Sequence, residues 1–178
     1  MDTSRTTSDA PALSVSQALI KRAFDFVVAL FGLICTWWLI ALAFLAASWD
    51  TRSNGFFIQQ RVGKDGRLFR VVKVKTMRPD KVTTTTVTRS GDPRITPLGR
   101  FFRKTKIDEL PQLWNVLLGE MSFVGPRPDV PGYADTLTGI ERAVLSIRPG
   151  ITGPATLKYR DEEDLSLIHI SEPTRPSQ

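Results

Sequence analysis

Cysteine and histidine are almost absent from this sequence. The 178 residues hold one cysteine, Cys35, inside the most apolar stretch, and one histidine, His169, in the polar C-terminal tail. A single cysteine excludes a disulfide framework and a thiolate metal cluster, and it is typical of a reducing compartment. A single histidine in such a tail excludes Ser-His-Asp and Cys-His nucleophile systems and the two-histidine zinc motif. Any catalysis must therefore rest on carboxylates, Lys, Arg, Tyr or a hard metal ion.

Glycine-rich phosphate-binding loops are also missing. The sequence contains neither Gly-x-Gly-x-x-Gly nor a Walker-type loop, and Gly63-Lys64-Asp65-Gly66 is too short for either, so we interpret it as a turn. The chain is basic, with a net charge of +6 and a pI near 9.8. This charge predicts an anionic partner. That partner is nucleic acid, an acidic membrane surface or a phosphorylated small molecule. The length fits one compact domain plus an anchor.

Residues 26–49 carry no charge and predict a membrane segment. At about 1.5 Å per residue this run measures roughly 36 Å as a helix, enough for a hydrocarbon core of about 30 Å. It is longer than the apolar region of a signal peptide and begins later. Basic residues flank both ends, so the positive-inside rule gives no orientation. Two alternatives stay open, a re-entrant segment and a straight span. The absence of proline favours the straight span, and Gly32 and Thr36 are the only residues that locally weaken the helix.

The chain divides into four parts on this basis. We expect a flexible lead-in over 1–17, a membrane-embedded helix with its flanks over 18–54, a catalytic domain over 55–165 and a tail over 166–178. The fold class is α+β. Strands are expected over 56–62 and 67–77, joined by an Asp65-Gly66 turn. In the second strand Val72 and Val74 alternate with Lys73 and Lys75, which predicts one apolar and one cationic face.

Helices and loops fill the rest of the domain. Residues 80–93 predict a surface loop, and 94–107 a basic amphipathic helix at the lipid surface, with Pro97 in its first turn. A second helix is expected over 110–118, ending at Gly119, and a third over 133–147. Between these two helices, residues 125–128 read Gly-Pro-Arg-Pro and predict a rigid loop.

Two adjacent carboxylates, Asp108 and Glu109, follow a cluster of cations and precede the proline-marked start of a helix. One interpretation is structural: Asp108 caps the helix, and Glu109 is a first-turn acid stabilised by the helix dipole. The other is chemical, because the same geometry lowers carboxylate pKa values and keeps the groups ionised, as a nucleophile or a Mg²⁺ ligand requires. The residues alone leave both interpretations open.

Lys73, Arg103 and Arg127 lie on three different predicted elements, a strand, a helix and the rigid loop. Each alone is typical of a solvated surface charge. If they converge on the Asp-Glu pair, they would clamp a diphosphate. Nucleic-acid binding is the rival use of such charges, but the aromatic residues lie mainly in the apolar segment and no helix-turn-helix or RNP pattern is present.

Six short motifs follow one another in a fixed order along the chain. They are Lys21-Arg22-Ala23-Phe24-Asp25, Gln60-Arg61-Val62-Gly63, Asp92-Pro93-Arg94-Ile95-Thr96, Ile107-Asp108-Glu109-Leu110-Pro111-Gln112-Leu113, Met121-Ser122-Phe123-Val124-Gly125-Pro126-Arg127-Pro128 and Pro149-Gly150-Ile151-Thr152-Gly153. In this order and spacing the sequence resembles the small monotopic phosphoglycosyl transferases, the bacterial sugar transferase family. The resemblance runs from about Lys21 to Leu165.

The resemblance implies an enzyme that transfers a phosphosugar from a UDP-sugar to polyprenol phosphate, usually undecaprenyl phosphate, with Mg²⁺ and release of UMP. This step starts a cell-surface glycan. By position, Asp108 would be the nucleophile and Glu109 would support the metal with it, while Lys73, Arg103 and Arg127 would bind phosphate. The resemblance also implies a re-entrant helix in the bacterial inner membrane, with the catalytic domain on the cytoplasmic face.

The sequence departs from the family at three places. Thr36-Trp37-Trp38 stands where the family often has a helix-breaking Ser-Pro pair, and Lys75 stands where it has an arginine, whose bidentate contacts Lys cannot reproduce. Similar proteins continue beyond Leu165, so we interpret 166–178 as a non-native tail.

Two rival functions remain open, and the sequence indicates neither the sugar nor the oligomeric state. The first rival is a membrane-anchored module that binds a nucleotide-sugar or an acidic lipid without turnover. The second is a nucleic-acid binder, whose affinity would fall steeply with salt.

Overall fold

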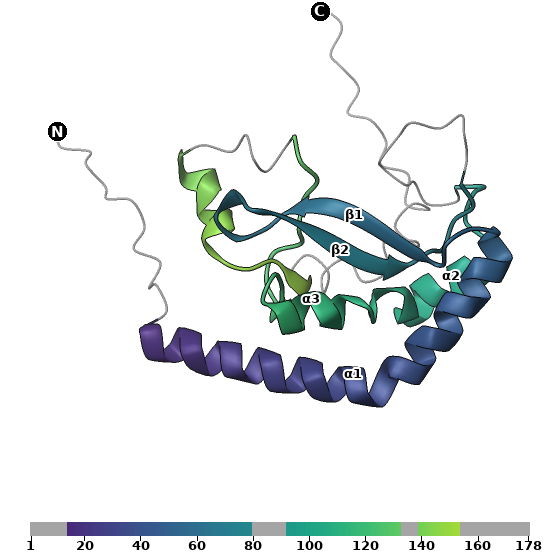
Figure 1. Ribbon diagram of the computed structural model, residues 1–178. Helices are drawn as coiled ribbons and strands as arrows, with labels where there is room; N and C mark the ends of the chain where they lie inside the picture. The colour runs from purple at the N-terminus through teal and green to yellow at the C-terminus, as the bar shows by residue number, and fades with distance from the viewer. Residues whose placement is uncertain (1–13, 80–91, 133–138, 154–178) are drawn as a thin grey trace, which may run out of the picture.

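A long N-terminal helix, a β-hairpin and a group of short helices make up the protein (Figure 1). The computed structural model describes residues 14–79, 92–132 and 139–153. Four predicted segments lie outside these ranges wholly or in part: residues 80–91 of the loop predicted over 80–93, the first part of the third helix, most of the lead-in, and the tail. Within them the fold mixes helix and sheet, as the α+β prediction expected.

Helix α1 (Val15–Thr51) begins earlier than its flanks predict. Ser14 caps it: the Ser14 hydroxyl accepts from the backbone N–H of Gln17, and the Gln17 side chain accepts from the backbone N–H of Ser14. The capping box places the start of the helix inside the predicted lead-in. Arg52, with a φ of 51°, ends the helix in the left-handed region.

Helix α1 bends sharply partway along its length (Figure 1). The hydroxyl of Thr36 donates to the carbonyl of Gly32 over 2.7 Å, a contact of the kind that bends helices. The absence of proline favoured a straight helix, and that expectation is wrong for α1. By length and composition α1 could cross a membrane.

The hairpin pairs β1 (Phe56–Val62) with β2 (Leu68–Val74) in antiparallel register. Asp65 and Gly66 both have positive φ, 59° and 77°, inside the short 3₁₀ turn η1 (Lys64–Gly66), which confirms the predicted Asp-Gly hairpin signal. Strand β2 ends three residues before the predicted boundary. The chain continues as an isolated bridge between Met77 and Ile95.

The predicted division of β2 into an apolar and a cationic face is correct only in part. Val74 is buried, but Val72 is half-buried, and Phe69 and Val71 are buried on the face that Lys73 shares. Lys73 therefore points with Phe69 and Val71 toward the interior side of the hairpin.

Three short helical elements follow. Helix α2 (Pro97–Thr105) has Pro97 in its first turn, as predicted, and Thr96 as its cap. Lys106, with a φ of 59°, separates it from the 3₁₀ turn η2 (Ile107–Glu109), and α3 (Gln112–Leu118) ends at Gly119, whose φ is 87°. The two predicted helices are thus present but shorter than expected.

A parallel pair of short strands holds the C-terminal part of the described chain. Strand β3 (Ser122–Val124) pairs with β4 (Gly150–Thr152), and between them the 3₁₀ helix η4 (Gly139–Ser146) replaces the described part of the predicted third helix. Gly125 and Gly150 pack backbone to backbone: a Cβ on Gly150 would lie 2.1 Å from the Gly125 nitrogen. Only glycine fits there, which fixes the start of the Gly-Pro-Arg-Pro loop.

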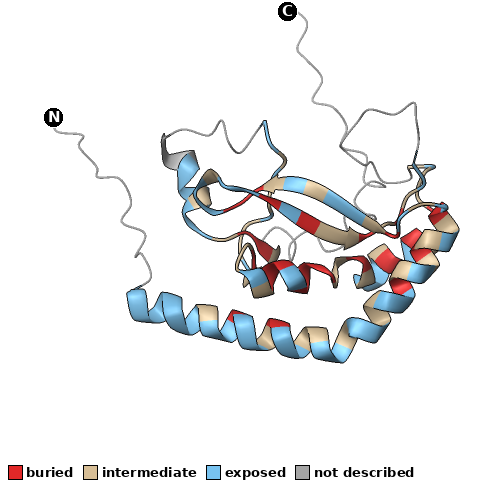
Figure 2. Cartoon of the chain, in the orientation of Figure 1, coloured by how far each residue is buried: buried red, intermediate tan, exposed pale blue. Residues whose placement is uncertain are grey.

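The core consists of two clusters that share the hairpin and α1. The first contains Ala29, Phe69, Val71, Val116 and Met121, and the second contains Ala43, Ala47, Val74 and Phe102. The first cluster includes Ala29, which precedes the bend in α1, and the second includes Ala43 and Ala47, which follow it. Figure 2 shows buried residues gathered where α1, α3 and the hairpin meet, while most of α1 is exposed.

Candidate active site

Asp108 is a buried carboxylate in η2, with 8% of its surface exposed. Its Oδ1 has no hydrogen-bond partner among the described residues. The helix-cap interpretation of Asp108 is wrong, because Pro111 occupies the cap position of α3 and no side chain caps that helix. A buried charge without a cap role is costly, so Asp108 is a candidate for chemistry.

Burial is the main electrostatic influence on Asp108. Burial first, and then the neighbouring Glu109 carboxylate, raise the pKa of Asp108 to about 6, against an ordinary value of 3.8. Lys73, Arg103 and Lys106 oppose that rise. The expectation that local geometry lowers this pKa is therefore wrong: burial outweighs the surrounding cations.

Glu109 is paired directly with Lys73. The Lys73 Nζ lies 3.1 Å from Glu109 Oε1, and both side chains are mostly buried. Lys73 is the second-last residue of β2, and Glu109 lies 36 residues later in η2. The end of the strand therefore places the Lys73 ammonium beside the carboxylate of η2. Of the three cations considered for a phosphate clamp, Lys73 therefore contacts the Asp-Glu pair directly.

A cationic cleft contains this ion pair. Arg127, from the loop after β3, lines the cleft together with Lys73 and Glu109, so two of the three predicted phosphate-binding residues share one surface. The polar and charged residues of the lining are Arg61, Lys73, Lys106, Glu109, Gln112 and Arg127. Four cations against one carboxylate make the cleft suited to an anion.

Arg103 takes a different position. Its Nε donates to the Thr76 hydroxyl over 3.0 Å, and it does not line the cleft. Its charge still acts on Asp108 and on Asp92. Arg103 is therefore close enough to act on Asp108 by its charge, although it lies outside the lining of the cleft.

Sequence reasoning missed Arg61 as a residue of the site. One guanidinium nitrogen donates to the Pro128 carbonyl over 3.1 Å and the other to the Gln59 side chain over 2.7 Å. Burial first, and then Arg127, lower the pKa of Arg61. Arg61 thus holds the Gly-Pro-Arg-Pro loop and adds a cation beside Arg127. Its place in the Gln60-Arg61-Val62-Gly63 motif was the available signal.

The Asp108-Glu109 pair has the chemistry to hold a magnesium ion if phosphate oxygens of a ligand and water complete its coordination. Among the described residues, no three His, Cys, Asp or Glu side chains gather as a metal site. Mg²⁺, however, is commonly bound through one or two carboxylates while phosphate oxygens and waters complete its shell. Two adjacent carboxylates, one with a free buried oxygen, meet that requirement.

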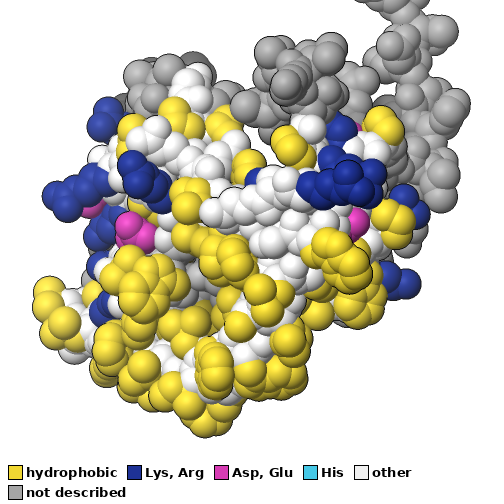
Figure 3. Space-filling view, turned by 45° about the vertical axis from the view of Figure 1, so that its right-hand side comes forward, with side chains coloured by type: hydrophobic (Ala, Val, Ile, Leu, Met, Phe, Trp, Pro, Cys, Tyr) yellow, Lys and Arg dark blue, Asp and Glu magenta, His cyan; other side chains and the backbone are white. Residues whose placement is uncertain are grey.

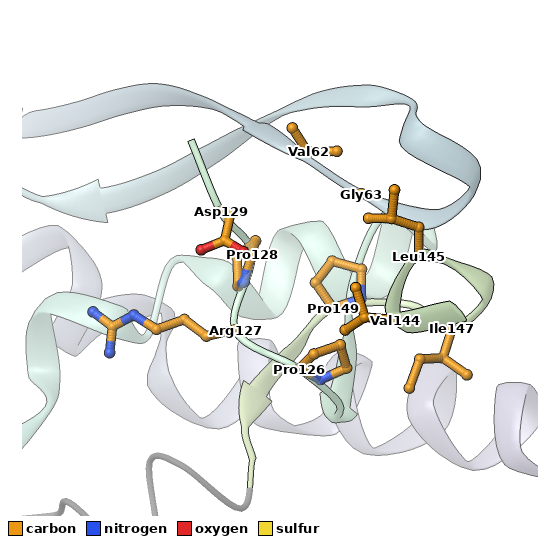
Figure 4. A pocket seen from close by; sticks show the side chains of 10 residues that line it. All are labelled: Val62, Gly63, Pro126, Arg127, Pro128, Asp129, Val144, Leu145, Ile147 and Pro149. Carbon is orange, nitrogen blue, oxygen red and sulfur yellow. The ribbon is translucent and has the colours of Figure 1, made fainter. Parts of the chain in front are cut away.

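An apolar hollow adjoins the cationic cleft along the same loop. Its apolar lining includes Val62, Pro126, Val144, Leu145 and Ile147. The Arg127 side chain extends away from these residues (Figure 4). The Gly-Pro-Arg-Pro loop thus borders an apolar hollow and presents its guanidinium elsewhere.

One surface of the molecule is strongly apolar. In Figure 3 hydrophobic side chains cover the lower part, where α1 lies, and Lys and Arg side chains lie above them. Phe31, Trp37 and Leu45 of α1 are each more than 60% exposed, and Phe101 of α2 and Trp114 of α3 are also exposed. Exposed apolar surface of this extent is typical of membrane contact.

Comparisons with known proteins agree with these features. The family model for the bacterial sugar transferases matches residues 16–172. The chain is 38% identical over 151 residues to a galactosyl transferase of Streptococcus agalactiae, covering 78% of this chain and 33% of that protein. It is 40% identical over 153 residues to the undecaprenyl-phosphate glucose phosphotransferase of Komagataeibacter xylinus, covering 82% and 29%.

A further relative is the UDP-glucose:undecaprenyl-phosphate glucose-1-phosphate transferase of Escherichia coli. It is 37% identical over 163 residues, which cover 88% of this chain and 34% of that protein. The chain therefore spans about a third of the length of these three relatives.

Proposed function

This chain belongs to the bacterial sugar transferase family, and we propose that it transfers a sugar phosphate from a UDP-sugar to polyprenol phosphate through a covalent intermediate on Asp108. The observation that carries the proposal is the buried Asp108 carboxylate, whose Oδ1 has no partner among the described residues and whose neighbour Glu109 lines a cationic cleft. Relatives named as acting on undecaprenyl phosphate support the acceptor.

The reaction would run in two displacements. An Asp108 oxygen attacks the sugar-bearing phosphorus, the bond from that phosphorus to the bridging oxygen breaks, and UMP leaves with the bonding electrons. The phosphosugar then remains as an acyl phosphate. A phosphate oxygen of the lipid attacks the same phosphorus, which releases Asp108 as a carboxylate. The water-soluble donor and the lipid acceptor therefore need not be bound together.

The cations of the cleft would offset charge repulsion. Asp108 must approach a diphosphate that is itself negative, so Lys73, Arg61 and Arg127 would hold the phosphate oxygens. Arg103 would act on Asp108 by its charge from outside the lining. The Asp108 and Glu109 carboxylates would hold Mg²⁺, which would neutralise phosphate charge when bound.

We place the reaction at the cytoplasmic face of the bacterial inner membrane, with α1 as a re-entrant segment. Ala29 on one side of the bend and Ala43 on the other pack against the same small domain. Their partners Val71 and Val74 lie three residues apart on β2, about 10 Å along the strand. A straight helix would hold Ala29 and Ala43, which are 14 residues apart, about 21 Å from each other.

A labelling experiment tests the covalent step. Full-length protein in nanodiscs is given a UDP-sugar labelled in the sugar, with Mg²⁺ and without polyprenol phosphate. We expect labelled protein and at most one equivalent of UMP. Asp108→Asn should carry no label, because the amide cannot form the intermediate, and Asp65→Asn, in the exposed hairpin turn, should behave as wild type.

Two other outcomes would identify a different function. UMP release only when lipid is present, with no label on the protein, would replace the covalent step by direct transfer. Binding of the UDP-sugar with no UMP release under either condition would identify a binding module.

Thiol accessibility tests the membrane topology. In a Cys35→Ser background, Ser16→Cys and Ser53→Cys should both resist an impermeant thiol reagent that is added outside intact cells. Labelling at position 16 alone would establish a helix that spans the membrane.

A further inference from the structure

Two buried side-chain atoms near the cleft have no hydrogen-bond partner among the described residues. They are Asp108 Oδ1, an acceptor, and Gln112 Nε2, a donor. Gln112 is 3% exposed. Native proteins leave few buried donors unpaired, and such a donor in an active site is often one that a ligand completes.

Gln112 is placed to meet the reacting group. It is the first residue of α3 and lines the cationic cleft beside Lys73, Glu109 and Arg127. It stands three residues after Glu109, which lines the same cleft. The free donor of Gln112 therefore borders a cleft that is also lined by Glu109, the sequence neighbour of Asp108.

Asn115 shows what a structural amide does in the same helix. It is 1% exposed, and its Nδ2 donates to the Arg70 carbonyl over 2.7 Å and to Glu120 over 2.6 Å. Its Oδ1 accepts from the Val72 backbone N–H over 3.3 Å. Both the donor and the acceptor atoms of the Asn115 amide are therefore hydrogen-bonded within the protein, whereas Gln112 Nε2 has no acceptor among the described residues.

We propose that Gln112 is a further catalytic residue, whose Nε2 donates a hydrogen bond to an oxygen of the phosphoryl group that Asp108 attacks. The inference rests on the proposed function for the identity of that group. As the Asp108 oxygen forms its bond to phosphorus and the bond to the UMP oxygen breaks, charge on the non-bridging oxygens must be held. Gln112 does so without adding charge beside Asp108, and no proton is transferred.

The test compares Gln112→Met and Asn115→Leu in the full-length chain in nanodiscs. Ligand-free Gln112→Met should melt at the wild-type temperature or above it, because an unpaired buried amide is removed. Asn115→Leu should melt well below wild type. Inorganic pyrophosphate should bind Gln112→Met roughly 10-fold more weakly than wild type, the loss expected for one hydrogen bond to a charged group.

The same variant is then followed in the labelling reaction. Formation of labelled protein should slow by roughly 100-fold, as for removal of one donor in an oxyanion hole. If wild type forms no labelled protein, the proposed function has failed, and pyrophosphate affinity still decides whether Gln112 binds phosphate.

Wild-type pyrophosphate affinity in Gln112→Met would overturn the inference. If Gln112→Met melts low, Asn115→Leu, which is destabilised while Gln112 stays intact, becomes the reference. An equal loss of pyrophosphate affinity in the two variants would overturn the inference, and a larger loss in Gln112→Met would support it.

Discussion

The Nζ of Lys73 lies 3.1 Å from Oε1 of Glu109, so a strand residue neutralises the carboxylate next to the proposed nucleophile. Lys73→Met should lower kcat/KM by roughly 100-fold, the cost of losing one well-placed donor. It should also move the acidic limb of the pH-rate profile to higher pH, since Lys73 holds the pKa of Asp108 down.

Lys64→Met provides the matched control for this change. Lys64 lies in the exposed hairpin turn, so its loss removes the same charge without touching the cleft. If both variants lose activity equally and neither shifts the pH profile, Lys73 acts through net charge alone.

Removing the buried charge of Asp108 should stabilise the metal-free protein at high pH. A pKa raised from 3.8 to about 6 means that folding favours the protonated form, so wild type loses stability as pH rises from about 4 through 6. That rise in pKa corresponds to roughly 3 kcal/mol above pH 7.

Asp108→Asn should therefore melt above wild type at pH 8 in EDTA and close to wild type at pH 4.5. Thermal unfolding in nanodiscs at the two values measures the difference. A stabilisation of equal size at both pH values would show that burial of the charge is not its cause.

Arg127 and Arg61 should both be needed to bind the substrate phosphates. Arg127→Ala should slow turnover by roughly 100-fold to 1000-fold, the range for losing one transition-state donor. Arg61→Met should weaken activity too, because it removes a lining cation and releases the Pro128 carbonyl. Arg70→Met, an exposed change on the same hairpin, should leave kcat and KM unchanged.

Arg22 should be important for stability. Its guanidinium donates to the carbonyls of Val116 and Leu117, over 2.7 and 2.8 Å, where α3 leaves its last carbonyls unpaired. Arg22→Met should cost about 2 kcal/mol of unfolding free energy, as expected for hydrogen bonds to a charged group. Thermal unfolding against Arg67→Met, an exposed change, tests this; equal melting temperatures would contradict it.

Local signals predicted the elements whose geometry is local. Asp65-Gly66 predicted the hairpin because its turn needs positive φ at two residues, and Gly119 predicted the end of α3 for the same reason. The motif order pointed to Asp108 and Glu109. The sequence did not predict the pairing of Lys73 with Glu109, because proximity of the cations to the carboxylates was only a condition for a phosphate clamp.

Tertiary packing decided what the sequence could not indicate. The bend in α1 involves contacts with residues of two clusters that lie far along the chain. The pKa of Asp108 rises because neighbours bury it, and no local pattern encodes burial. The free amide of Gln112 became visible only by contrast with the bonded amide of Asn115.

The apolar N-terminal helix is an integral part of the domain and not a detachable tether. Ala29 and Ala43 cover Val71 and Val74, so a fragment beginning after Thr51 would expose both clusters to water. The buried Asp25 also accepts from the Ser122 hydroxyl over 2.8 Å, at the strand that leads into the Arg127 loop. Trimming the anchor to obtain a water-soluble enzyme would therefore remove a wall of the catalytic domain, and purification has to keep the lipid-facing helix.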